Sequence, residues 1–151
     1  MAATSQTWEW QFEHPPGAMW PLLADTARFN EAAKLPKHQI TEIPQPDGSV
    51  HYFGAARMGP FDIKWQEKPV NWVSEQWFEH TRYFSSGPLK VLSAELHVEP
   101  NGTGSRVRYS MSIEPANLLG KLMLGKMFSG SRATFSRMVA EAASFVSGRR
   151  S

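Results

Sequence analysis

The residue types best suited to chemistry are concentrated in the segment QWFEHTRYF, residues 76–84. If this segment is a strand, its period of two places His80 and Arg82 on one side, between Phe78 and Phe84. An inward-facing imidazole and guanidinium could anchor an anionic or hydrogen-bonding group of a ligand, because a buried charge needs a partner. Sequence parity does not decide which side faces inward, since a one-residue change of register reverses it. The alternative, a solvent-facing pair beside a core formed by the intervening residues, stays open.

No other set of residues predicts a metal site, an activated nucleophile or a nucleotide-binding loop. The histidines lie on different predicted elements, whereas a zinc site needs three or four converging ligands. The chain has no cysteine, so thiolate catalysis and disulfides are excluded. The run GKLMLGKM has Met127 where a phosphate loop needs Ser or Thr. We therefore predict neither a metal nor a cofactor.

The sequence predicts seven strands, and their order determines which residues lie around His80 and Arg82. Alternation of apolar and polar residues is clearest in TWEWQFEH and in SRVRYSMSIE. Because the connections PQPDGS, MGPF, KPVN, SSGP and PNGTG are short, successive strands must pair antiparallel. The predicted strands cover residues 7–14, 38–45, 49–58, 61–68, 72–85, 89–99 and 105–114.

Two short helices are predicted between the first two strands, in HPPGAMWPLLADTARFNEAAKLP. Pro16 can start the first helix, where a missing N–H costs nothing, and Pro21 keeps it short or bent. Asp25 or Thr26 can cap the second helix. The pair would support one end of a longer helix.

That longer helix is predicted over residues 118–146, and three glycines lie inside it. They leave open a later helix start, a mobile first part or a local close approach to the sheet. Its apolar seam advances by threes and fours through Leu124, Phe128, Phe135, Met138, Ala142 and Phe145.

These elements predict one α+β domain over residues 1–151 with a cavity between sheet and long helix. A single helix is too narrow to cover the apolar face of seven strands. Apolar pockets with a few polar groups are the usual form of a small-molecule site. Our candidates for its lining are Tyr52, Trp65, Phe78, His80, Arg82, Tyr109, Met111, Phe128, Phe135 and Met138.

Charge is distributed unevenly, although the formal net charge is only +2. Residues 118–151 hold six Lys/Arg against Glu141 alone, which is either a solvated helix face or a basic surface for nucleic acid or anionic lipid. No basic run exceeds two residues, so we predict no nucleic-acid partner. The longest apolar stretch, residues 118–128, contains two lysines and is too short to span a membrane. The beginning of the sequence lacks a signal-peptide pattern, and we expect a cytoplasmic protein without integral membrane contact.

The order of elements, the block PPGAMWPLLAD, the turn GPL and the segment PNGTGSRVRYSM resemble the SRPBCC superfamily. This superfamily contains START domains, polyketide cyclase-like proteins and the birch-pollen allergen. The resemblance implies a helix-grip fold with a seven-stranded antiparallel sheet. The block WEWQFEHPPGAMWPLLADTARFNEAAKLP is also similar to the domain at the N-terminus of certain bacterial class III adenylate/guanylate cyclases.

The resemblance implies non-catalytic binding of a small apolar or amphipathic molecule, as a sensory N-terminal domain of a nucleotide cyclase. The alternative is a polyketide cyclase or dehydratase-like enzyme that uses His80, Arg82 or Tyr109 as acid, base or polariser. Nothing in the chain resembles a cyclase catalytic domain. The sequence leaves open a homodimer and a continuation of the chain beyond Ser151.

Overall fold

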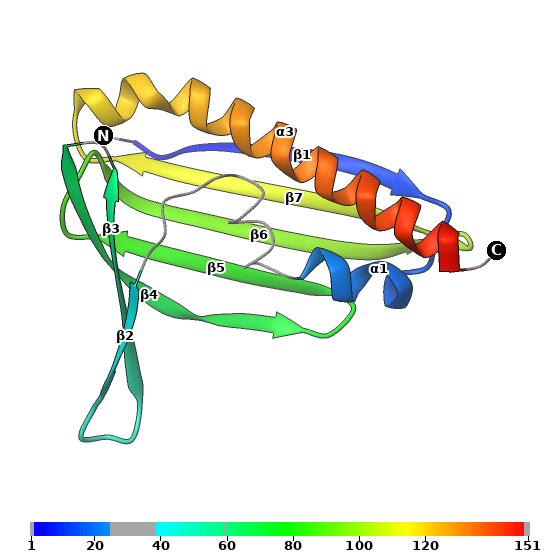
Figure 1. Ribbon diagram of the computed structural model, residues 1–151, viewed down its shortest axis with the longest axis horizontal. Helices are drawn as coiled ribbons and strands as arrows, with labels where there is room; N and C mark the ends of the chain where they lie inside the picture. The colour runs from blue at the N-terminus through cyan, green and yellow to red at the C-terminus, as the bar shows by residue number, and fades with distance from the viewer. Residues whose placement is uncertain (1, 25–38, 59, 150–151) are drawn as a thin grey trace.

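A computed structural model describes residues 2–24, 39–58 and 60–149 (Figure 1). The strands form one antiparallel sheet in the order β1-β7-β6-β5-β4-β3-β2. This confirms the predicted α+β architecture of a seven-stranded antiparallel sheet with a long C-terminal helix. In chain order the elements are β1 (Thr4–Phe12), α1 (Pro16–Leu23), β2 (Gln39–Pro44), β3 (Val50–Met58), β4 (Phe61–Val73), β5 (Trp77–Phe84), β6 (Leu89–Asn101), β7 (Gly104–Pro115) and α3 (Leu118–Arg149).

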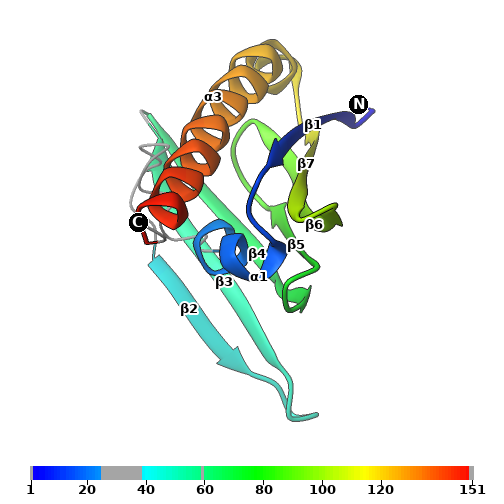
Figure 2. The ribbon, with the colours of Figure 1, turned by 90° about the vertical axis from the view of Figure 1, so that its right-hand side faces the viewer.

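One face of the sheet, here called the inner face, is covered by α3 and α1 (Figure 2). Helix α3 packs on β7 and β1, while α1 contacts α3 and β6. The helices cover this face because every second residue of β7 presents an apolar side chain on it. These buried residues are Val107, Tyr109, Met111 and Ile113. The β2–β3 hairpin extends away from both helices.

Helix α1 confirms the prediction made from its prolines. Pro16 occupies the first helical position, Pro21 lies inside, and the helix ends at Leu23 after only eight residues. It buries Met19, Trp20 and Leu23, and the Trp20 ring meets Phe78 of β5 edge-on at 6.3 Å. The second predicted helix, with its caps Asp25 and Thr26, falls outside the described residues.

Helix α3 begins at Leu118, so the later start considered from the glycines is wrong. Asn117 caps it, since its side-chain oxygen accepts a hydrogen bond from the Gly120 N–H at 3.0 Å. Any Cβ at Gly120 would overlap the Pro88 carbonyl oxygen, so a close approach explains this glycine. Gly125 and Gly130 have open space around them.

The predicted apolar seam of α3 is correct except at its last residue. Phe128, Phe135, Met138 and Ala142 are buried, but Phe145 is 50% exposed and Val146 is buried instead. Val146 lies four residues after Ala142, about one helical turn, and so comes back to the inner side. Phe145 lies one residue earlier and points away from it.

The predicted strand boundaries need correction in two parts of the chain. β1 runs from Thr4 to Phe12, three residues earlier than predicted, because β7 is long enough to pair with its polar beginning. The segment KPVN is part of β4, which runs to Val73 and does not turn there, so β5 begins at Trp77 and not at Trp72 as predicted. The chain instead turns at residues 74–76, where Glu75 has a φ of +64°. The register between β4 and β5 shifts between Lys68 and Asn71, so the ladder is irregular there and resumes with Asn71 opposite Glu79.

Candidate ligand-binding site

The register across the sheet decides which side of β5 faces inward. Phe78 pairs with Leu96, which pairs with Tyr109 of β7, and all three belong to the buried cluster beneath α3. His80 and Arg82 follow Phe78 at two-residue steps and therefore share the inner face. The inward alternative is correct, and the intervening residues of β5 lie on the outer face.

The inward pair is joined by a carboxylate from the neighbouring strand. Glu67 of β4 accepts hydrogen bonds at one oxygen, Oε1, from Arg82 Nε at 3.0 Å and from Trp65 Nε1 at 3.0 Å. His80 Nε2 lies 3.7 Å from the same oxygen. The Arg82 guanidinium also lies 4.9 Å from the centre of the Trp65 ring, a cation–π arrangement. We call these four residues the Glu67 cluster.

Gly54 of β3 sets the position of the indole in this cluster. Gly54 pairs with Trp65 across the β3–β4 ladder, and a Cβ at position 54 would overlap the indole atoms Cε2, Cζ2 and Nε1. The missing side chain therefore allows Trp65 to lie flat over β3. Trp65 is buried, and its N–H points to Glu67.

Electrostatics keep Glu67 ionised throughout the physiological range. The adjacent His80 imidazole, the Trp65 N–H and the Arg82 charge hold the pKa of Glu67 at about 2, although partial burial acts in the opposite direction. Burial lowers the pKa of Arg82, but Glu67 opposes this. The side chains of Glu67, His80 and Arg82 are only 18%, 18% and 16% exposed. The charges of Arg82 and Glu67 neutralise each other within this ion pair.

Acid unfolding is expected to show the contribution of Glu67. Its folded-state pKa of about 2 lies below the ordinary 4.5, so its stabilisation is full above pH 4.5 and disappears as the pH falls towards 2. The gap corresponds to at most about 3 kcal/mol, which solvent screening reduces to about 1–2 kcal/mol. The difference in unfolding free energy between wild type and Glu67→Gln should therefore shrink between about pH 5 and pH 2 in urea titrations. A difference that is independent of pH would contradict this account of the cluster.

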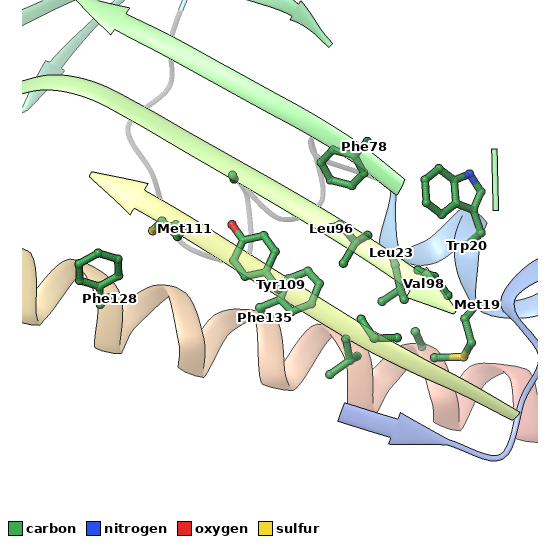
Figure 3. Packing of buried hydrophobic residues seen from close by; sticks show 14 of the residues in the cluster. Met19, Trp20, Leu23, Phe78, Leu96, Val98, Tyr109, Met111, Phe128 and Phe135 are labelled. Atoms are coloured by element: carbon green, nitrogen blue, oxygen red, sulfur yellow. The ribbon is translucent and has the colours of Figure 1, made fainter. Parts of the chain in front are cut away.

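Most of the apolar candidates belong to the buried cluster between the sheet and α3 (Figure 3). The Tyr109 and Phe135 rings stack with their centroids 4.3 Å apart. The Trp8 ring also stacks on Tyr109, with a centroid distance of 6.0 Å. Burial raises the pKa of Tyr109, which favours a structural ring over an acid or base. Phe78, Met111 and Phe128 complete this part of the buried cluster.

The structure thus separates the ten candidates into two groups. Trp65, His80 and Arg82 meet at Glu67, and Tyr52 lies directly opposite Glu67 in the β3–β4 ladder. The other six candidates are buried apolar or aromatic side chains of the core: Phe78, Tyr109, Met111, Phe128, Phe135 and Met138. Sequence reasoning missed Glu67 and Gly54. A charged residue continuing the apolar side of the predicted strand FDIKWQE was the available signal for the glutamate.

A hollow of about 470 Å³ lies where the sequence did not predict one. The hollow lies on the outer face of the sheet, where it is crossed by a row of residues paired from strand to strand: Thr41, Phe53, Gln66 and Tyr83. The cavity predicted between sheet and α3 is on the opposite face and stays a prediction. The hollow is lined by Thr41, Phe53, Gly54, Ala55, Lys64, Trp65, Gln66, Tyr83, Phe84 and Ser85.

The described residues show no group of three or more His, Asp or Glu side chains that could hold a metal ion. None of the helices described here is long and apolar enough to cross a membrane.

The sequence of residues 6–143 matches the family described as "Polyketide cyclase / dehydrase and lipid transport". The chain belongs to this family. No curated protein matches the chain. The family assignment agrees with the SRPBCC-type resemblance and with the sheet and helix described above.

Solved structures share the fold of this polyketide cyclase/dehydrase family chain at low sequence identity. The Zhui aromatase/cyclase from Streptomyces sp. R1128 has a TM-score of 0.66 at 8% identity, covering 93% of this chain and 94% of its own. A norcoclaurine synthase point mutant from Thalictrum flavum, in complex with a transition-state analogue, has a TM-score of 0.62 at 13% identity, covering 99% and 98%. Ara h 8.0201 has a TM-score of 0.60 at 14% identity, covering 95% and 99%. At these identities the likeness concerns the fold alone.

Proposed function

We propose that this protein binds a small, largely apolar molecule on the inner face of its sheet, with a polar group of that molecule at the Glu67 cluster. The observation that carries the proposal is the cluster itself, a hydrogen-bonded polar group beside the buried apolar side chains of the inner face. Few polar groups at fixed positions among apolar side chains are typical of small-molecule sites. Phe78 and Met111 supply apolar surface beside it.

The charges of the cluster favour a particular ligand chemistry. Arg82 and Glu67 compensate each other, so the site offers N–H donors with little net positive charge. A guanidinium has five N–H donors, of which the bond to Glu67 engages Nε. A neutral carbonyl or hydroxyl oxygen therefore suits the site better than the strongly anionic group considered from the sequence.

Filling the inner face beside His80 is expected to abolish binding. Ala94 of β6 is buried, pairs with both His80 and Met111, and lies between the cluster and the core. The probe is Nile red, a neutral apolar dye with a carbonyl acceptor, titrated by fluorescence. Ala94→Phe should weaken its binding at least about tenfold by occupying the space, because pockets of this kind bury most of their ligand.

The matched control places the same side chain one residue earlier, on the outer face. Ser93 forms a hydrogen bond to Thr81 at 3.3 Å on that side, so Ser93→Phe should leave binding within about twofold. Urea unfolding of both variants separates lost binding from lost folding. Saturable binding that Ala94→Phe leaves intact in the folded protein would contradict the proposed location.

A second candidate function is catalysis, and the contact between His80 and Glu67 specifically favours it. A carboxylate that stays ionised beside an imidazole can orient it and stabilise its protonated form. His80 would then exchange a proton with the ligand while Arg82 polarises a carbonyl, as cyclisation or dehydration of a poly-β-ketone requires. Turnover of such a compound by the wild type and its loss in His80→Ala, with Nile red binding preserved, would establish the enzyme. Binding without turnover supports the non-catalytic function.

We further propose that the binding domain serves a nucleotide cyclase as its sensory N-terminal part. The support is the resemblance of its N-terminal block to such domains and the position of α3. This helix covers the inner face with Phe128 and Phe135 and leads directly to the end of the chain. A ligand that displaces these rings would move the helix, which is the output a following domain could read.

A further inference from the structure

Three leucines at the beginning of α3 are exposed to solvent. Leu118 is 62% exposed, Leu119 42% and Leu122 73%. We call these residues the leucine patch. They occupy the first two turns of the helix, and Leu118 and Leu122 are one turn apart on the same side. Singly exposed leucines are ordinary, but three within five residues form a contiguous apolar surface.

Along α3, the charged residues within and after the leucine patch are all positive as far as Arg137. Lys121 and Lys126 are exposed and have no ion-pair partner in the described part of the chain. Arg132 and Arg137 continue the series, and the first acidic residue after Leu118 is Glu141. A surface that fits this patch must therefore be apolar beneath a negatively charged layer.

The fold holds the patch in place at one end of the sheet. The Ala116 N–H donates to the Pro88 carbonyl at 2.9 Å, and Gly120 lies against the same carbonyl. Phe61, 40% exposed, begins β4 at the same end of the sheet (Figure 1). The leucines are thus presented by an anchored helix end, and the exposed Phe61 lies at the same end of the sheet.

We propose that this end of the molecule docks on an anionic lipid bilayer. The leucines enter the boundary between headgroups and acyl chains, while Lys121 and Lys126 contact lipid phosphates. Apolar side chains interleaved with lysines, without acidic residues, are the composition of interfacial helices. A second copy of the chain fits less well, because a symmetric contact would bring the lysines of the two copies together. This docking does not depend on the proposed ligand-binding function.

Vesicle sedimentation tests the docking. The wild type should pellet with vesicles of 70% phosphatidylcholine and 30% phosphatidylglycerol, and increasing salt should release it. Leu122→Ser and Leu118→Ser should each reduce the partition coefficient at least about threefold. Lys121→Glu with Lys126→Glu should remove the preference for phosphatidylglycerol over pure phosphatidylcholine.

The matched control uses Phe145, a large exposed apolar residue near the other end of the same helix. Phe145 lies 23 residues beyond Leu122, roughly 35 Å along the axis, and Phe145→Ser should bind vesicles like the wild type. Thermal unfolding confirms that the variants are folded. Absence of vesicle binding, equal losses in Leu122→Ser and Phe145→Ser, or a solution dimer that Leu122→Ser dissociates would each overturn the proposal.

Discussion

Replacement of Phe135 by alanine is expected to lower the free energy of unfolding by about 3–5 kcal/mol, as large-to-small changes in a core do. Phe135 is only 2% exposed. Its ring stacks on Tyr109 of β7 at 4.3 Å and lies 5.3 Å from Trp10 of β1. One side chain therefore joins α3 to two strands, and its removal leaves a cavity at the main contact between helix and sheet. Urea unfolding followed by tryptophan fluorescence measures the effect.

Phe145 provides the control on the same helix. It is 50% exposed, so Phe145→Ala should cost less than about 1 kcal/mol, although the amino-acid change is identical. The contrast also tests the corrected seam, in which Val146 replaces Phe145 on the inner side. Similar losses in the two variants would show that α3 is rotated relative to the arrangement described here.

The fold could be predicted because alternation and helical periodicity are local properties. The apolar side chains of TWEWQFEH are half-buried against the core, and the seam of α3 is mostly buried. Each element therefore has an apolar side, which is visible in the sequence as a period of two or of three to four residues. The turn at KPVN was predicted wrongly because proline usually interrupts a ladder. Only the pairing with β5 shows that the ladder continues past an irregularity between Lys68 and Asn71 and that β4 runs to Val73.

The site could be predicted only in part because it depends on contacts between strands. His80 and Arg82 were found from their types, but their direction required the pairing of Phe78 with Leu96. Glu67 was missed because its role arises from Arg82, fifteen residues further along the chain. Spacing along one strand carries no information about which residue lies opposite.

The second large effect is expected at Gly54, where one added methyl group should disturb the whole Glu67 cluster. Because its Cβ would overlap the indole of Trp65, Gly54→Ala forces that ring to move or β3 to separate from β4. Such overpacking costs about 1–3 kcal/mol of unfolding free energy. The displaced indole would also withdraw its N–H from Glu67, so the affinity for Nile red should fall about tenfold. Urea unfolding and dye titration measure the two effects separately.

A double-mutant cycle identifies the clash as the cause. In the Trp65→Ala background the space over β3 is empty, so the further change Gly54→Ala should cost almost nothing, and the two effects should be strongly non-additive. Gly130→Ala on α3 is the control for glycine replacement itself. Nothing lies within 4 Å of its added Cβ, and alanine favours a helix, so this variant should gain up to about 1 kcal/mol. An unchanged cost of Gly54→Ala without the indole would mean that the glycine serves the backbone of β3 and does not position Trp65.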